Sequence, residues 1–145
     1  MSDFNREATS LPKASLEAYE VFDAIGGLEG GAPEAFAQLV DAFYEGVEAD
    51  PLLRAMYPEG DLAEERENLA LFLMQYFGGP ALYAQKRGHP RLRMRHVPFS
   101  IGPAERDAWM RHMGAALDQV PALAPVAPLM RAYFTSAAEF LRNRE

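Results

Sequence analysis

The sequence predicts an all-α fold, and three features of the 145-residue chain support that expectation. Apolar residues recur at three- and four-residue steps in several segments, which is the spacing of a helix with one buried face. No segment of five or more residues alternates between apolar and polar positions with β-branched enrichment, as a half-buried strand would. Valine and isoleucine are scarce, while alanine and leucine are plentiful. The length favours a single domain with one core.

The chain opens with a polar segment and a short helix. Residues 1–14 show no sustained period and are expected to form a loose tail. A helix is expected from Ser15 to the pair Gly26-Gly27, with an apolar stripe of Leu16, Tyr19, Phe22 and Ile25. The glycine-rich stretch 26–31 has neither spacing of a nucleotide phosphate loop, and no strand precedes it. We interpret it as a connector between helices.

A longer helix is expected to begin near Pro33, because proline suits the first turn of a helix. Its buried stripe comprises Phe36, Leu39, Val40, Phe43 and Val47, and Tyr44 lies at the edge of that stripe. The sequence ADP at 49–51 ends it. A short helical turn is expected over 51–56, and YPEGD at 57–61 reads as a turn.

A third helix is expected from about Asp61 to Phe77. Its apolar face comprises Leu62, Leu69, Phe72, Leu73 and Tyr76. Glu65 falls on the same face, and a carboxylate on an apolar stripe often marks a functional position or the rim of a cavity. The sequence GGP at 78–80 ends this helix strongly.

The remaining chain is expected to form short pieces and then two long helices. Pro90 and Pro98 limit any helix within residues 81–99 to about two turns. A helix should open at Pro103, with a stripe of Trp109, Met113, Ala116, Leu117 and Val120. The last helix should run from about Pro125 to Arg142, with a stripe of Val126, Leu129, Met130, Tyr133, Phe134, Ala137 and Leu141.

Composition and charge exclude several classes of function. A net charge of −7 and a pI near 5.0 argue against a general nucleic-acid binder, which needs a basic face. The absence of cysteine excludes disulfides, thiolate metal sites and iron–sulfur clusters. The first ten residues lack the regions of a secretory signal, and the longest apolar run, residues 69–74, is far shorter than the ~20 residues of a membrane span. We therefore expect a cytoplasmic protein that binds neither nucleic acid nor membranes.

Five of the fourteen Lys and Arg residues lie between Lys86 and Arg95, and this basic run ends in His96. Such a run in an acidic protein suits an anionic partner, such as the propionates of haem, although a solvated basic patch is the alternative. A single histidine is enough to hold a metal when a porphyrin supplies the other ligands. His89 is interpreted as a turn residue, and spacing leaves open whether His112 faces solvent or core.

Three stretches carry a resemblance to a known family. They are FYEGVEADPLLRAMYPEGDL (43–62), FLMQYFGGPALYAQKRGHPRLRMRHVPF (72–99) and IGPAERDAWMRHM (101–113). Together they resemble the truncated, two-over-two haemoglobins of bacteria, specifically group II. The resemblance implies an all-α truncated globin fold in which two antiparallel helix pairs sandwich a haem. It assigns residues 21–142 to the globin domain and residues 1–20 to an N-terminal extension that is partly disordered or helical.

The resemblance also implies site residues for haem b (iron protoporphyrin IX). His96 matches the proximal iron ligand. The distal side, where a small ligand would bind, matches Tyr44, Tyr57, Trp109 and Leu69. Contacts to the haem itself are expected from Asn68, Phe72, Tyr83, Arg87, Arg95 and Phe99, with Tyr83 and Arg87 near the propionates. An ungapped alignment places Glu65 at the distal gate, where the family usually has a small residue, and a shifted alignment would place Ala63 there.

The expected function is binding of O2, CO or NO at the haem, with sulfide and peroxide as further candidates. The Tyr/Tyr/Trp donors would give tight binding and slow release, each contributing on the order of 1–3 kcal/mol. A redox catalyst on the same haem, acting by nitric oxide dioxygenation or peroxide reduction, is the alternative, and it requires a separate, unknown reductase. A haem-free helical interaction module is the third hypothesis. A homodimer is one candidate for the oligomeric state, which the sequence does not determine.

Overall fold

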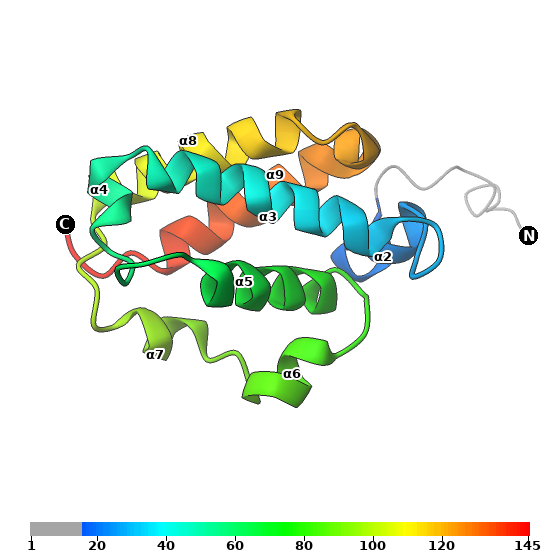
Figure 1. Ribbon diagram of the computed structural model, residues 1–145, viewed down its shortest axis with the longest axis horizontal. Coiled ribbons are helices and arrows are strands. Elements are labelled where there is room, and N and C mark those ends of the chain that lie inside the picture. The colour runs from blue at the N-terminus through cyan, green and yellow to red at the C-terminus, as the bar shows by residue number, and fades with distance from the viewer. Residues whose placement is uncertain (1–15) are drawn as a thin grey trace, which may run out of the picture.

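The computed structural model describes residues 16–145, and this part of the chain contains helices and connecting turns but no strand. The expected tail over residues 1–14 lies outside the described residues. The elements in order are η1 (Ala18–Glu20), α2 (Val21–Ala24), α3 (Ala32–Glu48), α4 (Pro51–Arg54), α5 (Ala63–Tyr76), α6 (Leu82–Arg87), α7 (Leu92–His96), α8 (Pro103–Asp118), η2 (Pro121–Val126) and α9 (Ala127–Phe140). Figure 1 shows the long helices stacked together, with α6 and α7 extended along one edge.

Helix α3 forms where the apolar stripe was expected. Pro33 occupies its first turn, and the whole expected stripe from Phe36 to Val47 is buried. Tyr44 is also buried rather than lying at a half-exposed edge, because α3 packs against both α5 and α8. Helix α3 is therefore the central element of the molecule.

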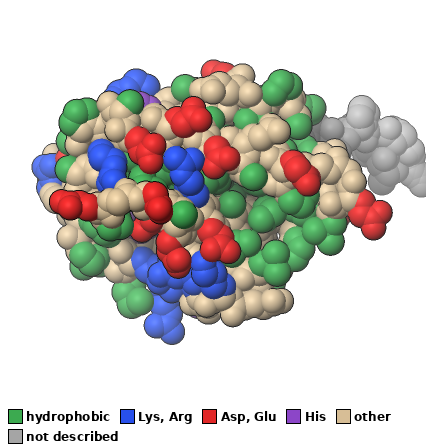
Figure 2. Space-filling model, in the orientation of Figure 1, with side chains coloured by type: hydrophobic (Ala, Val, Ile, Leu, Met, Phe, Trp, Pro, Cys, Tyr) green, Lys and Arg blue, Asp and Glu red, His purple; other side chains and the backbone are tan. Residues whose placement is uncertain are grey.

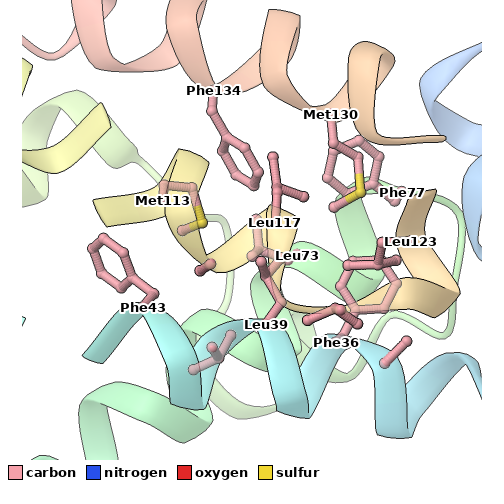
Figure 3. Packing of buried hydrophobic residues seen from close by; sticks show 14 of the residues in the cluster. Phe36, Leu39, Phe43, Leu73, Phe77, Met113, Leu117, Leu123, Met130 and Phe134 are labelled. Carbon is pink, nitrogen blue, oxygen red and sulfur yellow. The ribbon is translucent and has the colours of Figure 1, made fainter. Parts of the chain in front are cut away.

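The core lies among α3, α8 and α9. In Figure 3 buried side chains of these helices meet: Phe36 and Leu39 from α3, Met113 and Leu117 from α8, Met130 and Phe134 from α9. The last helix differs from expectation at its start. Residues Pro121–Val126 form a 3-10 turn, and the α-helix begins at Ala127, because Pro125 lacks the backbone N–H that a regular helix needs there.

The link between α5 and α6 requires glycine at one position. Gly78 has φ +101°, and a Cβ at this position would overlap the backbone carbonyl oxygen of Tyr19. This close approach joins the end of α5 to the first short helix, where Phe22 N–H donates to the Phe77 carbonyl at 2.9 Å. The first helix is shorter than expected, and Tyr19 is largely exposed.

Two polar contacts fix α4 against α8. Asp50 caps α4 by accepting from the Leu52 N–H at 3.0 Å, and its other oxygen lies 2.7 Å from Nε2 of His112. The hydrogen bond from His112 holds the pKa of Asp50 below its ordinary value. His112 is thus a structural residue facing a carboxylate.

Within residues 16–145, none of the helices combines the length and the apolar character needed to cross a bilayer.

Candidate functional site

A cavity of about 590 Å³ lies between the core helices and the α6–α7 edge. Its volume falls within the roughly 300–1,000 Å³ typical of cofactor pockets. Every residue expected to contact the haem or its ligand lines this one cavity: Tyr44, Tyr57, Glu65, Asn68, Leu69, Phe72, Tyr83, Arg87, Arg95, His96, Phe99 and Trp109. Spacing alone could not show this convergence, since these residues come from α3, α5, α6, α7, α8 and two loops.

His96 lines the cavity, and one of its two ring nitrogens is held by the backbone. Its Nδ1 lies 2.6 Å from the backbone carbonyl oxygen of Leu92, one turn earlier in α7. A carbonyl only accepts, so Nδ1 carries a proton and donates; in the neutral form of such a ring the lone pair is on Nε2. This is the arrangement that orients a histidine for metal ligation. The Phe99 ring meets the His96 ring edge-on at a centroid distance of 6.5 Å.

Helix α7 has only five residues, so side chains must hold it in place. On its N-terminal side, Arg95 donates from Nε to the Pro90 carbonyl at 2.8 Å and from an Nη to the Arg87 carbonyl at 3.2 Å. Arg95 was expected to contact the haem. It does line the cavity, but at least two of its donors are used to brace this loop.

Asn143 holds the other end of α7, and sequence reasoning missed it. Its Nδ2 donates to the backbone carbonyls of Phe99 at 2.7 Å and of His96 at 3.3 Å, while its Oδ1 accepts from the Ile101 N–H at 2.8 Å. The His96 carbonyl ends α7 and also accepts from the Phe99 N–H at 3.0 Å, and the Phe99 carbonyl lies just beyond the helix. The next residue, Arg144, pairs with Glu105 at 3.2 Å, so the C-terminal segment ties the His96 loop to the start of α8.

Across the cavity, polar tips of aromatic residues converge. The rings of Tyr44 and Tyr57 meet edge-on at 5.6 Å, and Phe43 bridges Tyr44 and Trp109 at 5.1 and 5.2 Å. Burial, followed by the neighbouring Tyr57, raises the pKa of Tyr44, and burial raises the pKa of Tyr57 to about 12. Both hydroxyls therefore keep their protons at neutral pH, and Tyr44 donates a hydrogen bond to the Tyr57 oxygen, which leaves the Tyr57 proton available.

The position of Tyr57 depends on Arg54, a residue that the sequence analysis did not identify. Arg54 donates to the carbonyls of Pro58 and Gly60, each at 2.8 Å, and thereby closes the turn that carries Tyr57. Since residues 57–60 have no regular secondary structure, this arginine replaces the backbone hydrogen bonds that a helix would provide.

Helix α5 contributes both apolar and polar atoms to the cavity wall. Leu69 and Phe72 line it together with Glu65, and Ala63 does not line it. The Oδ1 atom of Asn68 is buried without a hydrogen-bond partner. A buried polar atom without a partner is costly, and it is consistent with a polar group that the cavity is built to hold.

Lys86 and Arg87, the first two residues of the basic run, have different partners. Lys86 pairs with Glu67 at 2.9 Å and Glu64 at 3.4 Å, and the hydrogen bond to Glu67 raises its pKa. Arg87 lines the cavity with its guanidinium carbon 5.9 Å from the Tyr83 ring centre, and it makes no ion pair with any of residues 16–145. In Figure 2 basic side chains gather at the lower edge, over α6 and α7, beside acidic side chains. Arg87 is therefore available to an anion at the cavity wall.

Tyr133 is a further cavity residue that the sequence placed only in the core stripe of the last helix. It lines the cavity, and its ring stacks on that of Tyr76 at a centroid distance of 4.1 Å and an interplanar angle of 30°. Burial raises the pKa of Tyr133, and the adjacent Tyr76 raises it further. Tyr76 itself does not line the cavity and lies at the rim of α5, partly exposed.

These features fit a flat, mostly apolar cofactor with a central metal and anionic edges. The lining includes one histidine from α7, hydroxyl and indole groups from Tyr44, Tyr57 and Trp109, and the Arg87 guanidinium from α6. No group of three or more His, Cys, Asp or Glu within residues 16–145 could hold a metal ion without such a cofactor. Haem combines a metal that one histidine can ligate with two carboxylates, so the residues present fit it.

Comparison with known proteins gives the same result. The family model of the bacterial-like globins matches residues 20–138. The chain is 46% identical over 99 residues to the group 2 truncated haemoglobin YjbI of Bacillus subtilis, covering 68% of this chain and 70% of the relative.

Solved structures agree with this match. The haemoglobin of Chloroflexus aurantiacus superposes with a TM-score of 0.78 at 51% identity, over 86% of this chain and 98% of that one. The truncated oxygen-avid haemoglobin of Bacillus subtilis superposes with a TM-score of 0.75 at 38% identity, over 84% and 98%. The chain therefore belongs to the bacterial-like globin family as a group II truncated haemoglobin, a family whose cofactor is haem and whose ligands are small diatomic gases.

Proposed function

We propose that this chain holds haem b through His96 and retains O2 in a pocket formed by Tyr44, Tyr57 and Trp109, with tight binding and slow release. The observation that carries the proposal is the 2.6 Å contact between His96 Nδ1 and the Leu92 carbonyl. This contact occupies Nδ1 as a donor and so supports Nε2 as the nitrogen that would ligate the iron. Arg87, Tyr83, Asn68 and Phe72 would contact the edges and faces of the haem.

When bound, the haem supplies an iron atom with an open position for a small ligand. The chain supplies the environment of that ligand. A ligand that gains negative charge on binding is stabilised by donors in a dry pocket, where hydrogen bonds are electrostatically stronger than in water. Tyr44 and Tyr57 remain protonated at neutral pH, and the Trp109 indole N–H can only donate. The oxygen-avid relative from Bacillus subtilis supports the same direction of affinity.

Ligation by His96 is tested with the variants His96→Gly and His112→Gln. The His96→Gly protein should lose the haem absorption spectrum of the parent, and added imidazole should restore it, because the ligand then returns without the side chain. His112→Gln is the matched control, since glutamine can still bond Asp50 and the residue does not line the cavity. It should keep the parent spectrum. An unchanged spectrum in His96→Gly would assign the iron ligand to another residue.

A second candidate is redox catalysis at the same site, in particular peroxide reduction. The observation that favours it is the stacked pair of Tyr133 and Tyr76, which connects the cavity wall to the surface. Turnover would require an electron source. Haem-loaded protein that consumes one peroxide for every two electrons supplied would agree with this candidate.

A further inference from the structure

A continuous series of aromatic rings joins the cavity to one tyrosine on the surface. Tyr133 lines the cavity and stacks on Tyr76 at 4.1 Å. Phe72, also on the cavity wall, lies 6.1 Å from the Tyr76 ring. Trp109 connects to the same pair through Phe134, by steps of 5.6 and 5.4 Å. Three cavity-lining residues, Tyr133, Phe72 and Trp109, are therefore connected to the Tyr76 ring by aromatic contacts.

Tyr76 differs from the other tyrosines in its access to water. Its exposed fraction is 41%, whereas Tyr44 and Tyr83 are buried within the site. A phenol that loses an electron also loses its proton, and it does so only where water or a base can accept that proton. Tyr44 and Tyr57 hold their protons in a desolvated pocket. Tyr76 is thus the tyrosine on this ring series from which an electron and a proton can leave together.

Tyr19 provides the contrasting case. It is more exposed than Tyr76, with an exposed fraction of 67%, and its ring contacts no other aromatic ring within residues 16–145. If exposure alone decided which tyrosine is oxidised, Tyr19 would react first. If the ring series decides, Tyr76 would react first.

We propose that peroxide bound at the haem site oxidises Tyr76, with the electron passing from Tyr76 to the cavity through Tyr133. Tyr76 is then the surface phenol from which this protein gives up electrons. This rests on the proposed haem binding. The oxidant is a hydroperoxide, whose O–O bond breaks at the haem. Two phenols, one from each of two chains, each give one electron and one proton. The oxygen atoms leave as one alcohol and one water, or as two waters from hydrogen peroxide.

The two oxidised rings then couple to each other. One carbon–carbon bond forms between ring carbons next to the two hydroxyls, and the product is a dityrosine that links two chains. One hydroperoxide and two tyrosines are consumed for each link formed. A one-electron donor present in excess would instead restore Tyr76, so that this residue serves as the surface point at which a small phenol or a reductase delivers electrons.

The test treats haem-loaded protein with hydrogen peroxide and maps dityrosine by fluorescence and by mass spectrometry of peptides. The parent should give a covalent dimer joined through Tyr76. Tyr76→Phe should reduce the dimer to background, and Tyr133→Phe should lower its yield per haem bound. Tyr19→Phe is the matched control and should behave as the parent.

The outcomes separate this inference from the proposed haem binding. Protein that takes up no haem would overturn the proposed function before peroxide is added. Protein that carries haem and consumes peroxide, yet forms links through Tyr19 or forms none, would overturn the role of Tyr76 alone. A parent-like yield in Tyr133→Phe would show that electrons do not pass through Tyr133.

Discussion

Glu65 is the least expected residue of the cavity wall, because a carboxylate there faces mainly apolar and aromatic side chains. It makes no ion pair with any of residues 16–145, and its negative charge raises the pKa of both Tyr44 and Tyr57. Helical periodicity alone identified it as inconsistent with its stripe, and the cavity explains why it is tolerated. A side chain of this size and polarity is suited to control the entry of small ligands.

We expect Glu65→Ala to accelerate CO association with the reduced haem protein, because a smaller side chain at the proposed gate would widen the path of the ligand. Ala63→Val tests the alternative alignment: valine at this position should leave the rate unchanged, since Ala63 does not line the cavity. Flash photolysis measures both rates. Slower association in Ala63→Val, together with a parent rate in Glu65→Ala, would assign the gate to Ala63.

Trp109 is expected to slow oxygen release through its indole N–H. Trp109→Phe keeps an aromatic ring against Phe43 and Phe134 but removes the donor. A hydrogen bond to a charged acceptor contributes about 1.5–3 kcal/mol, so oxygen dissociation should become roughly ten- to hundred-fold faster. Stopped-flow displacement measures this rate. Dissociation of CO, a weaker hydrogen-bond acceptor, is the internal control and should change less. Equal changes for both gases would indicate a steric effect.

At the scale of elements, α7 is the clearest case of a helix that its own sequence cannot stabilise. It has five residues, none of them buried, and it follows Arg91 at φ +48°, a conformation that non-glycine residues seldom adopt. Arg95 and Asn143 hold its two ends. The orientation of His96 therefore depends on a residue 47 positions away in sequence.

We expect Asn143→Asp to make the position of His96 less well fixed. Aspartate keeps an acceptor for the Ile101 N–H but replaces the amide donor by a charge that faces two carbonyls. Loss of these bonds should cost about 1–3 kcal/mol, which corresponds to roughly five- to hundred-fold faster haem loss. The iron–histidine stretching band in resonance Raman spectra should shift as well, and a purely structural defect would leave that band in place.

Arg144→Ala is the control for Asn143→Asp. It removes the neighbouring ion pair with Glu105 and leaves the amide in place, and a half-exposed ion pair contributes little. Its haem loss and its Raman band should therefore stay close to those of the parent. Equal effects of the two variants would indicate that the C-terminal segment acts only as a tether.

The sequence predicted most of the elements for a simple physical reason. Stripes such as Phe36–Val47 record which face is buried, and Gly78 and the prolines mark where helices end. It failed where tertiary contacts decide. The roles of Arg54 and Asn143 depend on carbonyls that lie beside them only after folding. No local periodicity could identify those partners.

In the whole molecule, a well-packed core of α3, α8 and α9 carries a sparsely packed segment, residues 81–99 with α6 and α7, which we call the cover. The helices α3, α8 and α9 supply most of the large buried side chains. Helix α6 has one buried residue, Tyr83, and α7 has none. The resemblance supplied the site residues in advance, and the structure brings all of them to one cavity, but their roles toward haem remain predictions. Residues of α6 and α7, His96 among them, line that cavity, so haem bound there should link these two helices to the core.

We therefore expect removal of haem to unfold the cover before the core. Without a cofactor, the 590 Å³ cavity leaves residues 81–99 with few buried contacts, and segments of this kind open locally at low free-energy cost. A ligand that binds only the folded state stabilises by about 2.7 kcal/mol at a hundredfold excess over its Kd, and this gain should fall mainly on the segment that contacts it. Hydrogen exchange measured by mass spectrometry, with and without haem, should show a large loss of protection over residues 81–99 and little change in α3 and α8. Equal loss of protection across α3, α8 and residues 81–99 would show that haem stabilises the molecule as one cooperative unit.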